Sequence, residues 1–287
     1  MSYLIPSTIS EAIEFLEKEN GEARIVAGGT DLIIEKKSGK RKVDTLVDIS
    51  RIEEIKNIKL ENDYLVIGAA VSLTEISESE LVNKYFPCLA KGAGAVGCLQ
   101  IGNLATLPGN VITAQPAADA GMSLAPLDAV FVVEDSEGKR EIKQKDLYKG
   151  FGKSVIDSSK EMVTYIKIPI RENVKTEYIR LELRSYLDLP MLNACGAVSI
   201  KDNKFEDIHI TMGPVGVGPV RAVELEKWLK GKEVNKENIE YASKLSLKDS
   251  NPRSNPLRGS KEYRIKTLPV IVKRILISIA NQYNISL

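Results

Sequence analysis

The sequence predicts an α+β protein with two α/β subdomains followed by an antiparallel sheet with helices. Short apolar runs alternate with helical patterns near the N-terminus, hairpin patterns follow, and a long helical pattern closes the chain. The character of the chain changes between residues 170 and 176, so we expect a domain boundary there. The expected units are a first domain at 1–172, with subdomains at about 1–55 and 56–172, and a second domain at 173–287.

The first subdomain is expected to begin with a helix over residues 7–21. Thr8 and Glu11 have the spacing of a capping box at its start, and Asn20-Gly21 is a typical helix end. A short buried strand at 23–29 then runs into two glycines. A helical segment at 30–40 and a second strand at 44–50 complete the predicted subdomain.

The second subdomain is expected to contain a hairpin at 57–70, where Asn62-Asp63 supplies the turn. A helical stretch and a segment without Lys or Arg, from Gly92 to Val133, separate this hairpin from three further strands. The remaining elements are predicted as strands at 130–135, 139–144 and 162–170, an antiparallel sheet over 177–213, a helix at 221–231 and a long helical region at 260–283 with a bend at Pro269.

Composition indicates a protein with a substantial core. Of the 287 residues, 43% are hydrophobic and 28% charged, and the net charge of +1 provides no basic surface for nucleic acid or an acidic membrane. No apolar run reaches the roughly 18 residues of a membrane helix, and the N-terminus lacks the features of a signal peptide. The expected location is therefore cytoplasmic.

Metal and nucleophile chemistry have few candidate residues. Three cysteines cannot supply the four ligands of an ordinary iron–sulfur cluster, so any such cluster must lie on another chain. The only histidine, His209, lies in a strand pattern. We expect it to be a half-exposed strand residue and not a catalyst.

Residues 92–97, "GAGAVG", match the G-x-G-x-x-G spacing of a dinucleotide-binding loop. Such a loop needs a strand before it and a helix after it. Here the preceding residues read as a helix, and the segment that follows contains Pro108 and Pro116. We therefore expect these glycines to permit close packing of a helix end.

Two other glycine-containing stretches suit a nucleotide better. "IVAGGTDL" (25–32) follows a strand and precedes a helix, so its successive backbone amides could hold a diphosphate without a cationic side chain. "ATLPGNVITAQPAAD" (105–119) combines two threonine hydroxyls and Asn110 with a later acid, Asp119. Together the two loops predict a site that grips a dinucleotide from both sides.

These stretches resemble motifs of the flavoprotein (medium) subunits of molybdenum hydroxylases, the family of xanthine dehydrogenases and aerobic carbon monoxide dehydrogenases. "AGGTDL" is similar to the first FAD loop of that family, and "QIGNLATLPGN" with Asp119 is similar to the second. "YIRLELRSYLDLP", "ITMGPVGVGPVRAVELEKWLKG" and "LRGSKEYRIKTLPVIVKRIL" resemble its later segments in the same order. The resemblance implies an FAD-binding domain of the PCMH/CO-dehydrogenase-flavoprotein type followed by a CO-dehydrogenase-flavoprotein-like C-terminal domain.

The resemblance also implies which residues contact FAD. The first loop is expected to bind the diphosphate side of FAD, and Asp119 is expected to bind polar groups on the adenosine or ribitol side. Val163 and Arg180 are expected to flank the isoalloxazine, where a cation favours the reduced flavin. The full expected set is Ile25, Val26, Ala27, Gly28, Gly29, Thr30, Asp31, Leu32, Ile101, Thr106, Gly109, Asn110, Ile112, Thr113, Asp119, Val163 and Arg180. No catalytic residue and no metal ligand is expected.

The sequence departs from the family pattern in the second loop. Gly102 stands where the family has Arg, and Pro108 where it has Gly. Pro108 lacks an N–H, and Gly102 lacks a cation, so we expect lower FAD affinity or a different loop position. Leu189-Pro190 replaces Ile-Ala, and Arg180 replaces Lys with its charge retained.

The implied function is electron transfer through FAD. A molybdopterin large subunit oxidises the substrate, and electrons pass through [2Fe–2S] clusters on a small subunit to FAD on this chain and leave to NAD or another acceptor. Two alternatives remain open at this stage: a stand-alone NAD-binding oxidoreductase that uses "GAGAVG", and a scaffold subunit of the same fold without FAD.

Overall fold

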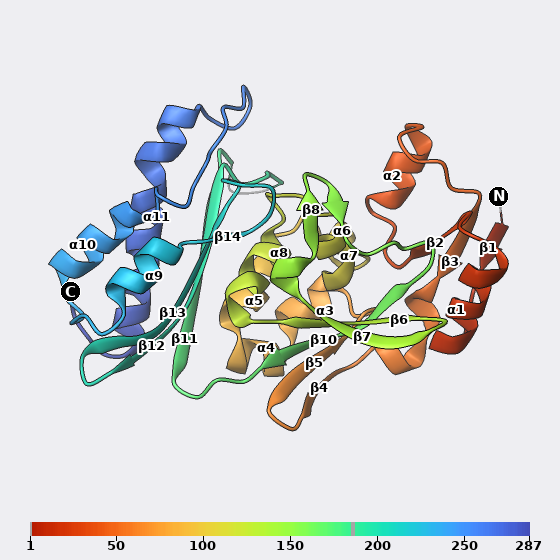
Figure 1. Cartoon of the computed structure of the whole chain (residues 1–287), viewed down its shortest axis with the longest axis horizontal. Helices are drawn as coiled ribbons and strands as arrows, with labels where there is room; N and C mark the ends of the chain where they lie inside the picture. The colour runs from red at the N-terminus through yellow and green to blue at the C-terminus, as the bar shows by residue number, and fades with distance from the viewer. Residues whose placement is uncertain (1, 185–186) are drawn as a thin grey trace.

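The computed structural model describes residues 2–184 and 187–287 (Figure 1). Its N-terminal part is a small parallel sheet of order β1-β3-β2, formed by β1 (Ser2–Leu4), β2 (Ala23–Val26) and β3 (Thr45–Asp48). Helix α1 (Ile9–Lys18) connects β1 to β2, and Thr8 caps it by accepting a hydrogen bond from the Glu11 amide, as the spacing predicted. Helix α2 (Leu32–Lys37) follows β2.

The middle of the chain forms a five-stranded antiparallel sheet of order β4-β5-β10-β6-β7. The predicted hairpin is present, with Asn62 at a positive φ of 52° in its turn. The strands of the sheet are β4 (Ile58–Glu61), β5 (Tyr64–Gly68), β6 (Val130–Asp135), β7 (Gly138–Lys143) and β10 (Met162–Pro169). A separate two-stranded ribbon consists of β8 (Tyr148–Gly150) and β9 (Lys153–Ser154).

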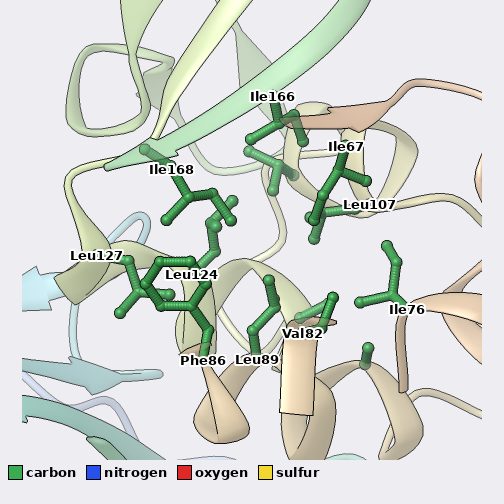
Figure 2. Close-up of a cluster of buried hydrophobic side chains, with 14 of the residues drawn as sticks. Ile67, Ile76, Val82, Phe86, Leu89, Leu107, Leu124, Leu127, Ile166 and Ile168 are labelled. Carbon is green, nitrogen blue, oxygen red and sulfur yellow. The ribbon is translucent and has the colours of Figure 1, made fainter. Parts of the chain in front are cut away.

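Six short helices pack against this sheet. Their apolar side chains meet Ile67 of β5 and Ile166 and Ile168 of β10 in the largest core of the protein (Figure 2). The helices are α3 (Leu73–Glu78), α4 (Glu80–Tyr85), α5 (Pro87–Gly94), α6 (Leu99–Gly102), α7 (Leu107–Ile112) and α8 (Asp119–Leu124). Single turns of 3₁₀ helix lie at Ile49–Arg51, Glu53–Ile55, Ala125–Leu127 and Gln144–Asp146.

The C-terminal part is the predicted antiparallel sheet, of order β11-β12-β13-β14. Its strands are β11 (Val174–Leu181), β12 (Leu192–Lys201), β13 (Lys204–Gly213) and β14 (Val220–Arg221). Helices α9 (Val223–Leu229), α10 (Lys236–Leu245) and α11 (Lys261–Gln282) cover one face. Helix α11 runs through Pro269 as one helix.

Strand β12 is buried on both faces, which fixes how the two halves of the chain meet. Leu192, Ala194 and Val198 pack toward the C-terminal helices, whereas Cys195 and Ala197 join the core of the helices that follow β5. Figure 1 shows α5 and α8 on the side of this sheet opposite α11. Because side chains alternate along a strand, one face of β12 packs against the C-terminal helices and the other packs against the segment that contains the second predicted loop.

Candidate functional site

The first predicted loop lies between the carboxyl end of β2 and the start of α2. Gly28 touches the second loop directly, because a Cβ added there would come within 2.0 Å of the Leu104 carbonyl oxygen. Gly29 has a φ of +66°, a conformation that favours glycine. The two glycines therefore permit a tight turn and a close approach of the two loops.

The backbone amides of this loop are unsatisfied. Among the residues that the structure describes, none accepts a hydrogen bond from the amides of the segment 27–31, and the Asp31 side chain does not cap α2. Backbone N–H groups need acceptors, and consecutive free amides in a concave turn suit an anion such as a diphosphate. That these amides bind a diphosphate stays a prediction.

The second loop is held mainly by its own hydrogen bonds. Thr106 caps α7 by accepting from the Gly109 amide, Asn110 Oδ1 accepts from the Gly121 amide at 3.0 Å, and the Thr113 hydroxyl donates to the Asn110 carbonyl at 2.9 Å. The Asn110 oxygen and the Thr113 hydroxyl proton are thus engaged within the protein. The Asn110 Nδ2 group is the amide donor that remains available for a ligand.

The two departures from the family pattern fit their surroundings. Pro108 lies in the first turn of α7, where a backbone N–H has no intrahelical acceptor, so the helix loses no bond. Gly102 ends α6, and a Cβ there would come within 2.8 Å of Thr74 Oγ1. A larger residue at 102 would therefore have to displace the Thr74 hydroxyl.

Both loops open into one cleft of about 1050 Å³. This volume lies at the upper end of the range of about 300–1,000 Å³ for small-molecule sites, as a long dinucleotide requires. All predicted site residues except Asp119 and Arg180 line it: Ile25, Val26, Ala27, Gly28, Gly29, Thr30, Asp31, Leu32, Ile101, Thr106, Gly109, Asn110, Ile112, Thr113 and Val163.

Asp119 lines a smaller pocket of about 190 Å³, which shares Val96, Gly97 and Asn110 with the large cleft. The carboxyl is 3% exposed, and burial raises the pKa of Asp119 to about 6. Tyr178 and Asn193 donate hydrogen bonds to its Oδ1 atom and oppose this rise. Asp119 is thus a buried acid at the edge of the cleft, and its pKa of about 6 lies close to neutral pH.

Arg180 lines neither cavity. Its Nε lies 2.6 Å from a Glu182 carboxylate oxygen and 3.7 Å from Asp119 Oδ1, and its Nη1 donates to the Ala95 carbonyl at 2.9 Å. The Arg180 side chain is therefore part of an ion-pair cluster with Glu182 and Asp119. Its place beside a flavin ring stays a prediction.

Sequence reasoning missed several cationic residues of the cleft. Lys149, Lys153, Arg253 and Arg258 line it and form no ion pair among the described residues. They come from the β8–β9 ribbon and from the loop before α11, so they lie far apart in sequence. The Arg- and Asn-containing stretch "NPRSNPLRGS" was the one local signal. Cationic side chains therefore line the cleft in addition to the backbone amides of the first loop.

The "GAGAVG" stretch does not form a Rossmann turn. Residues 92–94 end helix α5, and a Cβ on Gly92 would come within 2.1 Å of Ser123 Oγ in α8. No strand enters the motif, and the glycine permits close helix packing, as expected. Gly97 nevertheless lines the cleft, with a φ of +64°.

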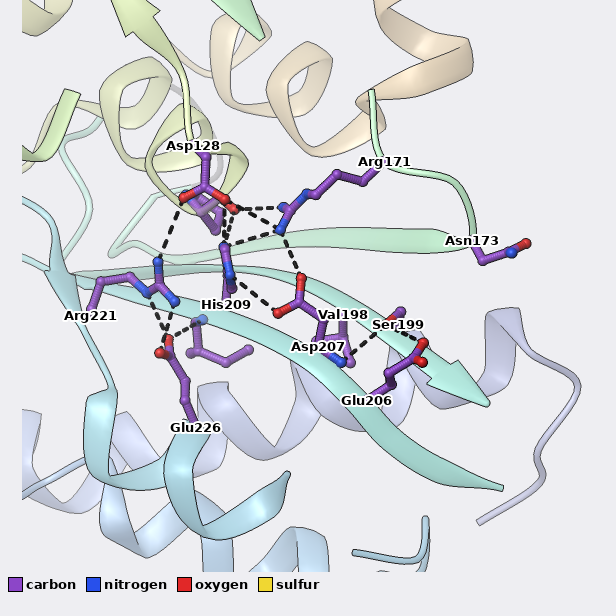
Figure 3. A network of polar contacts seen from close by, with 12 residues as sticks. Asp128, Arg171, Asn173, Val198, Ser199, Glu206, Asp207, His209, Arg221 and Glu226 are labelled. Carbon is purple, nitrogen blue, oxygen red and sulfur yellow. Dashed lines mark hydrogen bonds and ion pairs between the residues drawn. The ribbon is translucent and has the colours of Figure 1, made fainter. Parts of the chain in front are cut away.

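His209 belongs to a charge cluster where the two halves of the chain meet (Figure 3). Its Nδ1 lies 3.2 Å from Asp128 Oδ2 and its Nε2 lies 3.4 Å from Asp207 Oδ1, while Arg171 and Arg221 flank the group. The group lies outside the cleft, and His209 belongs to strand β13, as the strand pattern predicted.

The residues that the structure describes contain no group of three or more His, Cys, Asp or Glu side chains arranged to hold a metal ion. Nor does any helix within 2–184 or 187–287 combine the length and apolar character needed to cross a membrane.

Known proteins resemble the chain over nearly its whole length. Family models described as the FAD binding domain in molybdopterin dehydrogenase and the CO dehydrogenase flavoprotein C-terminal domain match residues 1–171 and 178–279. The glyceraldehyde dehydrogenase medium chain of Sulfolobus acidocaldarius is 31% identical, with 97% of this chain and 98% of that protein covered. The xanthine dehydrogenase FAD-binding subunit of Escherichia coli O157:H7 is 26% identical, with 96% and 94% covered. The structure of reconstituted CO dehydrogenase from Oligotropha carboxidovorans matches with a TM-score of 0.91 at 26% identity, with 98% of each chain covered.

Proposed function

Because the chain belongs to the family of FAD-binding medium subunits of the molybdenum hydroxylases, we propose that it passes electrons from iron–sulfur clusters on a partner subunit through FAD to an external acceptor such as NAD. The partners are an iron–sulfur small subunit and a molybdopterin large subunit, and substrate oxidation takes place on the latter. The complex acts in the cytoplasm.

The observation that carries this proposal is the cleft into which both glycine-containing loops open. It offers free amides at 27–31 from one side and the Asn110 Nδ2 group from the other. Lys153 and Arg253, which form no ion pair with any residue that the structure describes, also line it. These groups suit the diphosphate of FAD, since anions bind where backbone N–H groups and cations converge.

This chain's own residues bind and orient the cofactor. The first loop holds the diphosphate, Val163 and Ile101 supply apolar contact for the rings, and Asp119 accepts a hydrogen bond from a cofactor hydroxyl. Bound FAD supplies the redox chemistry, because it can exchange electrons both singly and in pairs. The protein excludes water from one side of the bound cofactor, and charged side chains near the flavin tune its reduction potential.

The first test is the absorbance spectrum of the purified chain, with mass identification of what acid releases. We expect flavin bands near roughly 370 and 450 nm and about one FAD per chain. A colourless chain that also fails to take up added FAD would contradict the binding step and would favour the scaffold alternative.

The electron acceptor needs its own experiment. The chain is reduced photochemically with FAD bound and is then mixed anaerobically with NAD, a quinone or an oxidised ferredoxin. We expect NAD to reoxidise the flavin fastest. Reoxidation by ferredoxin or quinone alone would leave FAD binding intact and replace NAD as the acceptor.

The subunit partners are tested by co-expression of this chain with an iron–sulfur small subunit and a molybdopterin large subunit of the same family. We expect a complex that contains all three polypeptides and that reduces the flavin when substrate is added. Flavin that stays oxidised in such a complex would contradict the proposed electron path.

A further inference from the structure

The candidate cofactor acid Asp119 is held by side chains from the other half of the chain. Asp119 is the first residue of α8, whereas Tyr178 lies on β11 and Asn193 on the neighbouring strand β12. The Tyr178 hydroxyl donates to Asp119 Oδ1, and Asn193 Nδ2 lies 3.4 Å from the same oxygen and 3.3 Å from the Tyr178 hydroxyl. Both side chains are buried.

All donors to the carboxyl group converge on one oxygen. Arg180 Nε also lies nearest to Oδ1, at 3.7 Å. Oδ2 accepts no hydrogen bond from the described residues, yet it is not among the protein's fully buried polar atoms without a partner. With respect to the described residues, this oxygen is therefore not fully enclosed, and it belongs to a residue that lines the small pocket beside the cleft.

We propose that Tyr178 and Asn193 are positioning residues, which fix the Asp119 carboxylate through Oδ1 so that Oδ2 accepts a hydrogen bond from a hydroxyl of bound FAD. The inference rests on the proposed function and deepens it. A carboxylate that is clamped by one oxygen loses little rotational freedom when the other binds a ligand, so the C-terminal sheet raises the affinity of a site formed largely by the N-terminal half.

The same clamp sets a pH dependence. Burial raises the pKa of Asp119 to about 6, Glu182 acts in the same direction, and the Tyr178 and Asn193 hydrogen bonds with the Arg180 cation oppose it. Asp188 also lines the small pocket. The ionised carboxylate is the better acceptor, so FAD affinity falls as pH drops through about 6. Because the Tyr178 hydrogen bond lowers the pKa of Asp119, loss of the Tyr178 hydroxyl raises this pKa, and FAD affinity then begins to fall at a higher pH.

The test measures the FAD dissociation constant of the full chain between pH 5 and 8 by flavin fluorescence. Tyr178→Phe is compared with Tyr148→Phe, a matched control that removes another largely buried hydroxyl, which lies 3.1 Å from Gln144 Nε2 and forms no hydrogen bond with Asp119. We expect Tyr178→Phe to weaken binding about 10-fold at pH 7. We expect its pH midpoint to rise by about one unit, while Tyr148→Phe retains the wild-type profile.

Other outcomes separate this inference from the proposed function. If Tyr178→Phe loses thermal stability but keeps the wild-type affinity and pH profile, the hydroxyl is only a strap between the two halves, and the proposal is overturned. If Tyr178→Phe does not fold, Asn193→Ser is expected to shift both quantities in the same direction by a smaller amount, and an unshifted profile overturns the proposal equally.

A wild-type chain that does not bind FAD contradicts the proposed function first. The clamp is then tested on the ligand-free chain by ¹³C titration of the aspartate carboxyl groups, with Asp119→Asn for assignment. We expect the Asp119 pKa to rise in Tyr178→Phe. An unchanged pKa would show that Tyr178 does not hold the carboxylate.

Discussion

Arg180 is the residue whose role depends most on where the flavin ring lies. Its guanidinium is shared among Glu182, Asp119 and two backbone carbonyls. If it also lies near the ring, it stabilises the negatively charged reduced flavin. We expect Arg180→Met to lower the two-electron reduction potential of bound FAD by about 30 mV, which corresponds to about 1.4 kcal/mol.

Arg180→Lys is the control for this potential, because it keeps the positive charge at this position. We expect it to stay within a few millivolts of wild type. A potential that is unchanged in Arg180→Met, with reduced stability, would assign Arg180 to the Glu182 ion pair alone.

Residues with a local motif could be predicted from the sequence, and those without one could not. Gly28, Gly29 and the Thr106 cap stand in short stretches whose turn and cap chemistry is local, and the structure places them on the cleft. Lys149 and Arg253 reach the same cleft through long-range folding. Nothing in their immediate sequence indicates a shared site, so they were not expected.

The two predicted loops lie in close contact at Gly28. Gly28→Ala would place a methyl group against the Leu104 carbonyl, so the loops must separate. We expect this variant to lose about 1–3 kcal/mol of stability, as overpacked sites do, and to bind FAD more weakly. Denaturant unfolding and fluorescence titration measure the two effects.

Gly94→Ala is the matched substitution in the "GAGAVG" stretch. A Cβ there meets only the Ser77 side chain at 3.4 Å, so we expect stability within about 0.5 kcal/mol of wild type and unchanged FAD affinity. The opposite pattern, with Gly94→Ala abolishing nucleotide binding, would revive the alternative of a dinucleotide loop at 92–97.

The His209 cluster joins the turn before β6 to strands of the C-terminal sheet. Burial first, and then Arg221 and Arg171, lower the pKa of His209 from its usual 6.5, against the opposing effect of Asp128 and Asp207. A lowered histidine pKa contributes stability above pH 6.5 that is lost as pH falls through the folded-state value.

We therefore expect the single histidine signal in a proton NMR titration to have its midpoint below 6.5. We also expect the free energy of unfolding to decline below pH 6.5 less steeply in His209→Gln than in wild type. A midpoint at or above 6.5 would mean that the two carboxylates outweigh burial and the arginines.

Most helices and strands could be predicted because their signals are periodic and local, as for α1 with its cap and for the hairpin at β4 and β5. Two features needed the tertiary structure. The packing of β12 between two cores cannot be read from its apolar run alone, since either face could be the buried one. The boundary near residue 172 stays a prediction.

For the molecule as a whole, ligand binding and stability are linked, because the cleft is lined by both halves of the chain. FAD at about 100 times its dissociation constant should stabilise the folded state by about 2.7 kcal/mol, which raises the melting temperature by several degrees. NAD added without FAD at the same concentration should produce a much smaller shift in melting temperature. A shift produced by NAD and not by FAD would favour the NAD-binding alternative.

The clamp on Asp119 has a consequence for the exchange of parts between related subunits. The loops that grip the cofactor belong to the N-terminal half, but the donors that orient Asp119 belong to β11 and β12. A chimera that joins the first half of this chain to the second half of a relative inherits a competent site only if the graft brings a tyrosine and an asparagine at these two positions. The proposed clamp therefore predicts that the first and second halves of the chain cannot be exchanged independently of each other without loss of FAD affinity.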